Sequence, residues 1–296
     1  MSTRTPPRSL FRALVDDAAV FPPGDAPVPV AWAEHLRLRR GGYADLLGPL
    51  LVGTAHAQEL ARVAAGPGGD HAPVDVAVVA RAGVPVQELV TAATRLRGLD
   101  AVRVVSVEVT LDEDGSSRHA LPLVLPVPVE VDRDPATLPG ALDELRSAAP
   151  TAAAPVLAKL RTQATAEHPV PTAVELAGFL SAAQARDLPV KLTGGLHHAL
   201  ARTSAEGHGR PTLQRHGLLN VLAALVHLHG GADEQTLADV LTDEDPARLG
   251  GLLTSLDEPS VARLRHRFRS FGCCGVTDPL DELVGLGLLA AVPVPR

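Results

Sequence analysis

Lysine is almost absent from this chain of 296 residues. Lysine and arginine together number 27, and Lys159 and Lys191 are the only lysines, which leaves 27 − 2 = 25 arginines. The bias toward Ala, Val, Arg and Pro is typical of a GC-rich genome, whose codon drift replaces lysine with arginine. A lysine that persists against this drift is therefore more informative than an ordinary lysine.

Aromatic side chains and positive charge are also scarce. Aromatics make up 2% of the chain, and the formal net charge is −7. Because nucleic-acid binders use basic patches and stacking platforms, we expect no nucleic-acid partner. The two cysteines, Cys273 and Cys274, are adjacent, which excludes a disulfide framework and a CxxC pair. The sequence identifies no base for either thiol, so we interpret both as small buried hydrophobic residues.

No segment has the features of a secretion signal or a membrane span. The first apolar stretch is interrupted by Asp16 and Asp17, and no clean cleavage site follows it. The longest apolar helix candidate, Leu218 to Leu228, is too short to cross a bilayer. Hydrophobic residues form 46% of the chain, too many for a disordered protein. We expect a folded cytoplasmic protein without a membrane partner, and the sequence leaves a homo-oligomer open.

Short β-branched runs alternate with amphipathic stretches rich in Ala and Leu. Seven runs are predicted strands: Leu50–Thr54, Val74–Arg81, Ala101–Leu111, Leu123–Asp132, Val156–Thr162, Val190–Thr193 and Arg267–Cys274. An eighth strand is expected near residues 10–20. The alternation of strands and helices indicates parallel βα units, and eight units fit a single (β/α)8 TIM-type barrel over residues 1–296. No GxGxxG motif follows a strand near the N-terminus, and we expect no cofactor.

Helices are predicted between the strands, with a longer insertion after the seventh strand. They are Val84–Leu96, Thr137–Ala148, Thr172–Arg186, Gln214–His229, Asp233–Leu241 and Pro279–Leu286. Residues 199–265 are therefore predicted to form a helical and loop elaboration near the barrel mouth, which includes the Gly/Pro/His-rich loop Arg202–Pro211. Thr172, Asp233 and Asp278 are expected N-caps of their helices.

The period-two geometry of a strand places both lysines inside the barrel. In the sixth strand, Lys159 and Arg161 alternate with aliphatic residues that suit the helix layer, and Lys191 occupies the equivalent face of the seventh strand. Both lysines lie toward the C-terminal ends of consecutive strands, where barrel enzymes place their chemistry. We therefore expect the two amines side by side in the barrel mouth.

A lysine can act as a nucleophile or a base, which an arginine cannot, because the pKa of an amine falls on burial or near other cations. We expect two ammonium groups beside Arg161 to lower the pKa of at least one amine. The alternative is that each lysine is an interior charge paired with Glu108 or Glu130, which end their own strands. Two lysines retained in a chain that otherwise uses arginine favour a functional role.

The segment Val190-Lys191-Leu192-Thr193-Gly194-Gly195-Leu196 resembles the seventh-strand segment of deoxyribose-phosphate aldolase-like class I aldolases, Val-Lys-Ala-Ser-Gly-Gly-Ile. In that family a lysine on strand six forms a Schiff base, a lysine on strand seven tunes it, and Gly-Gly turns help to hold the substrate phosphate. The resemblance implies that Lys159 is the Schiff-base residue and Lys191 its tuning residue. It also implies that Gly194 and Gly195 form the glycine turn.

The neighbouring residues depart from that aldolase pattern. Leu160-Arg161-Thr162-Gln163 follows Lys159 where the family has Thr-Ser-Thr-Gly, and His197-His198 replaces the arginine after the glycine turn. The wider pattern is similar to a bacterial barrel family of unassigned activity, which carries Lys-x-Arg-Thr, Lys-x-Thr-x-Gly-Leu-His-His, His-Gly-x-x-Asn and Ser-Phe-Gly segments.

Histidines are the candidate acid–base groups. His197 and His198 follow the glycines, and adjacent residues of an extended segment point to opposite sides, so at most one faces the site. His216 and Asn220 share one face of a helix start and would approach the mouth if the loop 202–211 folds over it. One histidine would act as acid or base for an enolate or enamine intermediate. The alternative is that His216 and Asn220 cap or pack their helix.

A rival interpretation makes the histidines and Glu108 ligands of a divalent metal. The chain has no HExxH or HxH spacing to support it, so we assign no metal. Asp16 ends the first predicted strand and would either reach the mouth or lie in a solvated turn. The candidate substrate-binding residues are Asp16, Arg161, Thr193, Gly194, Gly195, Asn220, Ser270 and Gly272.

Three functions remain open from the sequence. The first is an enzyme with Lys159 and Lys191 at its centre and His197, His198, His216 and Glu108 as further catalytic candidates. It would act on a small anionic carbonyl metabolite, with or without a phosphate group, by Schiff-base aldolase or lyase chemistry. The second is a divalent-metal-dependent isomerase or lyase in which the lysines bind substrate. The third is a non-catalytic barrel that binds an anion.

Overall fold

Eight parallel strands close into a barrel in the computed structural model, which describes residues 5–66, 72–111, 120, 124–165, 168–204 and 213–291. The strand order around the barrel is β1-β10-β7-β6-β5-β4-β3-β2. Their bounds are Val15–Asp17 (β1), Leu47–Gly53 (β2), Val74–Val79 (β3), Val102–Thr110 (β4), Val127–Glu130 (β5), Val156–Arg161 (β6), Val190–Thr193 (β7) and Phe268–Cys273 (β10). The predicted (β/α)8 barrel and all eight of its strands are confirmed.

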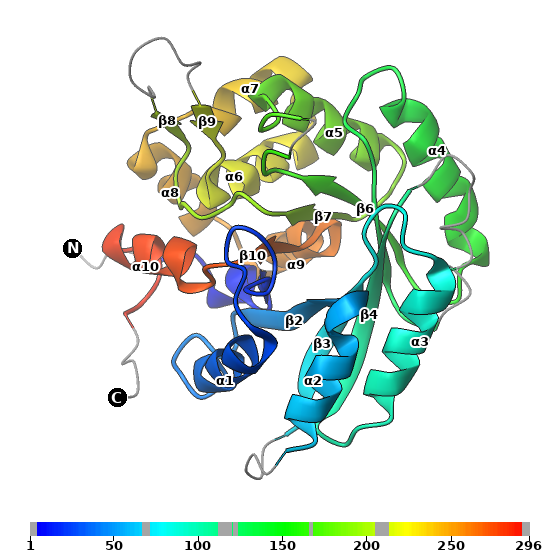
Figure 1. Cartoon of the computed structure of the whole chain (residues 1–296). Helices are drawn as coiled ribbons and strands as arrows, with labels where there is room; N and C mark the ends of the chain where they lie inside the picture. The colour runs from blue at the N-terminus through cyan, green and yellow to red at the C-terminus, as the bar shows by residue number, and fades with distance from the viewer. Residues whose placement is uncertain are drawn as a thin grey trace.

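Helices surround this barrel on its outer side (Figure 1). Their bounds are Val28–Leu38 (α1), Ala57–Ala64 (α2), Val86–Arg97 (α3), Leu138–Ala148 (α4), Ala173–Ala185 (α5), Leu218–His229 (α6), Glu234–Leu241 (α7), Pro246–Thr254 (α8), Glu258–Arg267 (α9) and Thr277–Gly285 (α10). Short 3-10 turns cover Arg8–Phe11, Thr54–His56 and Ala149–Thr151. None of the helices in the described ranges has the length and apolar character needed to cross a bilayer.

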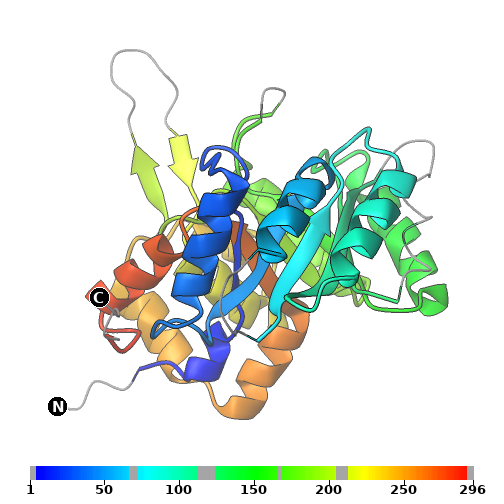
Figure 2. The same ribbon diagram turned by 60° about the horizontal axis from the view of Figure 1, so that its bottom comes forward.

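The segment between β7 and β10 is the largest departure from plain βα repetition. It contains α6 to α9 and a two-stranded antiparallel sheet of β8 (Arg202–Ser204) and β9 (Leu213–Arg215), which projects from the body in Figure 2. The predicted loop Arg202–Pro211 therefore begins as a strand, and its residues 205–212 lie outside the described ranges. Helix α6 starts at Leu218 rather than at Gln214 because residues 213–215 pair with β8.

Two helix N-termini match the sequence and one does not. The Thr172 hydroxyl accepts a hydrogen bond from the backbone N–H of Glu175 in a capping box, and the Asp233 carboxylate accepts one from Thr236. The prediction that Asp278 caps the last helix is wrong, because α10 begins at Thr277, two residues before the predicted start at Pro279. The Asp278 side chain lies in the first turn and contacts His197 instead.

Side chains inside the barrel divide into an apolar part and a charged part. The β3 residues Val74, Val76 and Val78 face the helices and join the main core. Ala77 and Val79 point the other way, into a small apolar cluster inside the barrel. The rest of the interior, toward β1, β4 to β7 and β10, holds the buried charged groups described next. Period-two alternation thus builds two different environments from one strand.

Candidate functional site

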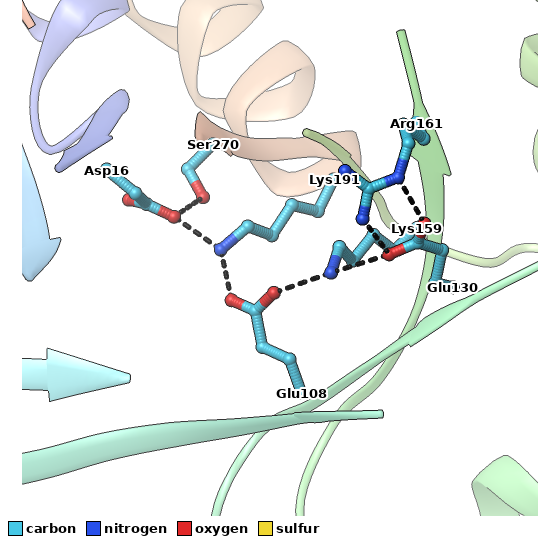
Figure 3. A network of polar contacts seen from close by, with 7 residues as sticks. All are labelled: Asp16, Glu108, Glu130, Lys159, Arg161, Lys191 and Ser270. Carbon is cyan, nitrogen blue, oxygen red and sulfur yellow. Dashed lines mark hydrogen bonds and ion pairs between the residues drawn. The ribbon is translucent and has the colours of Figure 1, made fainter. Parts of the chain in front are cut away.

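A chain of ion pairs crosses the barrel interior from β1 to β6 (Figure 3). The Lys191 ammonium on β7 lies 2.5 Å from Asp16 Oδ2 on β1 and 2.5 Å from Glu108 Oε1 on β4. The other oxygen of Glu108 lies 3.0 Å from the Lys159 ammonium on β6. Glu108 is therefore shared between the two lysines.

The network continues outward from Lys159. Its ammonium also lies 2.9 Å from Glu130 Oε2 on β5, and Arg161 donates to both oxygens of Glu130, at 2.8 and 3.2 Å. At the other end of the chain the Ser270 hydroxyl donates to Asp16 Oδ2 at 2.7 Å. Three carboxylates thus face three cations, a balance that buried charges require.

The strand register explains why the lysines are neighbours. Lys159 on β6 is paired with Lys191 on β7, and Glu130 on β5 is paired with Lys159. The predicted placement of both lysines side by side inside the barrel is confirmed. The solvated-turn alternative for Asp16 is wrong, because Asp16 is 1% exposed and ion-paired.

The direction of each pKa shift in the network follows from the number of oppositely charged neighbours of the buried group. Burial opposes the charge of Lys191, but Asp16 and Glu108 outweigh it and raise the pKa of this amine. Burial likewise opposes the charge of Glu108, but Lys191 and Lys159 together lower its pKa to about 2. Asp16 has one cationic partner, so burial dominates and raises its pKa despite Lys191 and Ser270. For Lys191, the expectation of a lowered pKa is wrong because carboxylates, not cations, surround it.

A cavity of about 690 Å³ opens above the network. Its wall includes Lys159, Glu108, Glu130 and Arg161 of the network, and also Thr193, Gly194, Gly272 and His197 among the predicted site residues. Arg81, Arg133 and His168 add further basic groups to the same wall. Lys191, Asp16 and Ser270 are not part of this wall and lie beneath it. Of the two lysines, Lys159 therefore faces the cavity, and Lys191 supports it from behind.

The glycine turn after β7 is required by space and by backbone conformation. Gly194 and Gly195 have φ values of +70° and +78°. A Cβ at Gly195 would lie 2.5 Å from the Thr162 carbonyl oxygen, and one at Gly194 would lie 2.6 Å from Gln163 Oε1. The Gly194 N–H donates to the Gly272 carbonyl at 2.9 Å. The turn therefore joins the ends of β6, β7 and β10, and only Gly194 of the pair lines the cavity.

The two adjacent histidines point to different partners. His197 lines the cavity, and its Nδ1 lies 2.8 Å from Asp278 Oδ2. His198 Nδ1 lies 2.9 Å from Glu282 Oε1 on α10. Only one of the two faces the cavity, as the alternation predicted.

His216 and Asn220 are buried away from the network. His216 Nε2 lies 2.7 Å from the Pro171 carbonyl oxygen. The Asn220 side chain accepts from the Ala201 N–H and donates to the carbonyls of Val240 and Asp243. Neither residue lines the cavity, and their contacts match the packing alternative. The loop that would have covered the mouth falls largely on residues 205–212, outside the described ranges.

Two features escaped the sequence interpretation. Arg81 and Arg133 follow β3 and β5 and could have been found from their position at the C-terminal ends of strands. Cys274 was interpreted as a buried hydrophobic residue, yet it is half-buried, lines the cavity and has His197 as a neighbour. No sequence signal links these two residues, which lie 77 positions apart. Cys273 is buried as predicted.

Within the described ranges, no group of three or more His, Cys, Asp or Glu side chains is arranged to hold a metal ion. The metal-dependent alternative thus stays a prediction with no site in that part of the chain. No protein family, curated protein or solved structure matches this chain significantly.

Proposed function

We propose that the protein is an enzyme that forms a Schiff base between Lys159 and a small anionic carbonyl compound. The observation that carries this proposal is the position of Lys159, whose ammonium lies at the cavity wall between Glu108 and Glu130, with Lys191 behind Glu108. A lysine amine next to groups that can accept its proton is the arrangement that nucleophilic amine catalysis needs. The reaction class is carbon–carbon bond cleavage or formation next to the carbonyl.

The neighbouring carboxylate supplies the proton transfers. Glu130 Oε2, 2.9 Å from Lys159 Nζ, takes a proton from the ammonium and frees the amine to attack the carbonyl carbon. A carbon–nitrogen bond forms, the carbonyl oxygen receives two protons that leave the nitrogen, and water departs. The product is an iminium ion at Lys159, and no external oxidant or reductant is needed.

The charge balance of the network is preserved through this step. Lys159, Lys191 and Arg161 face Asp16, Glu108 and Glu130 before the reaction. An iminium ion carries the same positive charge as the ammonium that it replaces, so the carboxylates remain neutralised. Lys191 acts by holding Glu108 in place and by its positive charge.

The basic residues of the cavity wall support an anionic substrate. Arg81, Arg133 and Arg161 all line the cavity, and Arg161 is half-exposed while still bound to Glu130. Guanidinium groups recognise carboxylate and phosphate with paired hydrogen bonds. A carboxylate or phosphate on the substrate would therefore orient its carbonyl toward Lys159.

The test is reductive trapping. The protein is incubated with pooled short aldehydes, ketones and 2-keto acids, treated with borohydride, and mapped by mass spectrometry. We expect an adduct on Lys159, no adduct at this position in Lys159→Arg, and slower trapping in Lys191→Met. The absence of an adduct on either lysine with every pool would overturn the proposal.

A second candidate is a barrel that binds an anion without catalysis. It is favoured by the observation that both lysines are already ion-paired and nearly fully buried. The Lys159→Arg variant separates the two functions, because arginine keeps the charge but cannot form a Schiff base. Unchanged anion binding by this variant, together with no trapped adduct in the wild type, would establish the binding function.

A further inference from the structure

The cavity contains a second group of reactive side chains, on the wall formed by the end of β10 and the start of α10. Cys274 Sγ lies 3.4 Å from His197 Nε2, and His197 Nδ1 lies 2.8 Å from Asp278 Oδ2. The imidazole thus stands between the Cys274 thiol and the Asp278 carboxylate, with one ring nitrogen toward each, and Nδ1 also lies 3.6 Å from the buried Cys273 Sγ. Cys274 and His197 both line the cavity.

This order of groups is the arrangement of a nucleophile, its base and the residue that orients the base. The Asp278 carboxylate accepts the Nδ1–H, which fixes the tautomer and leaves Nε2 directed at the thiol. Contacts with the thiols of Cys273 and Cys274, together with the hydrogen bond to Asp278, outweigh partial burial and raise the pKa of His197. The ring can therefore hold a proton that leaves the thiol.

We infer that Cys274 is a nucleophile that adds reversibly to the carbonyl carbon of a small aldehyde bound in the cavity. In this step the Cys274 thiol passes its proton to His197 Nε2 as the sulfur–carbon bond forms and the carbonyl π bond breaks. The imidazolium then gives the same proton to the alkoxide oxygen. The product is a hemithioacetal, and His197 returns to its starting form.

An aldehyde fits this group better than an ester or thioester. Addition to an aldehyde needs one proton carrier and no leaving group, which is what His197 and Asp278 supply. The inference does not rest on Schiff-base formation, because the residues involved are separate from Lys159 and its carboxylates. The basic wall residues Arg81, Arg133 and Arg161 favour an aldehyde that carries a negative charge.

His197 has a neighbour in the chain that serves as a matched control. Cys273, adjacent to Cys274, is fully buried but contacts His197 and is therefore not a neutral position. His198 is adjacent to His197 and pairs with the α10 carboxylate of Glu282, on the side away from the cavity. The variant His198→Gln therefore reports on local packing without touching the proposed chemistry.

The first experiment measures the alkylation rate of Cys274 by iodoacetamide at pH 7, followed by peptide mass mapping. We expect His197→Gln to slow the reaction about tenfold or more, Asp278→Asn to slow it less, and His198→Gln to leave it unchanged. Circular dichroism checks that each variant is folded, and Asp278→Asn serves as the test if His197→Gln does not fold. Equal rates in the wild type, His197→Gln and Asp278→Asn would overturn the inference.

The second experiment tests the aldehyde in the Lys159→Arg background, in which a Schiff base at that position cannot form. Glyoxylate, an anionic aldehyde, is expected to protect Cys274 from iodoacetamide, while glycolate, of similar size and charge but without the aldehyde, is not. Equal protection by both compounds, or by neither, would overturn the inference. Because the readout is the thiol, failure here is distinguishable from failure to trap an adduct on Lys159.

Discussion

Lys159 and Lys191 occupy paired positions on neighbouring strands, and Glu108 gives one carboxylate oxygen to each of their ammonium groups. Two buried cations on adjacent strands would repel each other strongly without this shared anion. Glu108 reaches them from β4, which is separated from β7 by two strands of the barrel. The curvature of the closed barrel therefore brings the Glu108 carboxylate to both ammonium groups and compensates their buried charge.

Replacing the shared carboxylate is expected to destabilise the fold. Glu108→Gln leaves two buried ammonium groups with one carboxylate each, and an uncompensated buried charge costs about 3–5 kcal/mol. Urea unfolding measures the loss in the free energy of unfolding. Glu88→Gln, on the exposed side of α3, is the matched control and is expected to change it by less than about 0.5 kcal/mol. Similar values for the two variants would contradict the shared role of Glu108.

The stability of the protein is expected to fall in acid over a defined range. The lysines lower the pKa of Glu108 from 4.5 to about 2, so the unfolded chain binds a proton here at a higher pH than the folded protein. The stabilisation is present above pH 4.5 and is lost as the pH falls through about 2, with a magnitude of about 3 kcal/mol. Glu130, whose pKa Lys159 and Arg161 also lower against burial, contributes with the same sign.

The raised pKa of Asp16 affects stability with the opposite sign, and it decides the pH interval in which the contribution of Glu108 can be measured. Burial raises its pKa above 3.8, so below this pH it is protonated in both states and contributes nothing further. Urea unfolding between pH 3.8 and 2 should therefore show a steep loss in the wild type and a shallower one in Glu108→Gln. A wild-type free energy of unfolding that stays constant over this interval would contradict the ion-pair network.

Strand placement and side-chain direction could be read from the sequence because they depend on local periodicity. The alternation of aliphatic and charged residues in β6 and β7 fixed the direction of Lys159 and Lys191, and chain order made the two strands neighbours. Four helices were missed, α1, α2, α8 and α9, and for the last two the reason is equally local. In α9 only Val261 and Leu264 are buried, too narrow an apolar stripe to identify, and α8 contains Gly250 and Gly251.

Contacts between segments far apart in the chain could not be predicted from local sequence periodicity. Glu108 meets Lys191 across the barrel interior, 83 positions away. The sequence offered pairing of the lysines with Glu108 or Glu130 only as an alternative, and the structure shows both partners, because strand patterns alone do not specify which side chains meet across the barrel. The carboxylate Asp278 reaches His197 only because α10 packs beside the end of β7. A base for Cys274 was present in the sequence as His197, but nothing in the spacing of the two residues connects them.

Gly48 on β2 is expected to be intolerant of a side chain. A Cβ at this position would lie 2.0 Å from Asp16 Oδ1, and Asp16 is held in place by Lys191 and Ser270. Gly48→Ala should therefore destabilise the protein by about 1–3 kcal/mol. Gly140→Ala in α4 meets no atom within 4 Å and should be neutral or stabilise by up to about 1 kcal/mol. Thermal unfolding compares the two variants. If Gly48→Ala unfolds at the same midpoint temperature as the wild type, the predicted clash with Asp16 is wrong.

The glycine turn after β7 provides a second matched pair. Gly195 and Gly231 both have positive φ, +78° and +85°, so alanine at either position costs about 1–2 kcal/mol in backbone strain. Gly195→Ala adds a clash with the Thr162 carbonyl, 2.5 Å from the new Cβ, whereas Gly231→Ala meets nothing within 4 Å. Chemical denaturation should show a larger loss for Gly195→Ala. Equal losses would mean that the β6 and β7 ends separate without cost.

Glu130 is the carboxylate with the best access to both Lys159 and the cavity, and its removal should slow the proposed chemistry. Glu130→Gln keeps the side-chain volume but cannot accept the ammonium proton, so trapping of a Lys159 adduct by borohydride should slow by about 10²–10⁴-fold. Arg161 loses its partner in this variant and becomes freer to bind an anion, so the affinity for a carboxylate ligand should not fall. Glu88→Gln, an exposed position that does not line the cavity, should trap at the wild-type rate. If Glu130→Gln traps as fast as the wild type, then Glu130 is not the proton acceptor, and Glu108, 3.0 Å from the same ammonium, takes its place as the residue to vary.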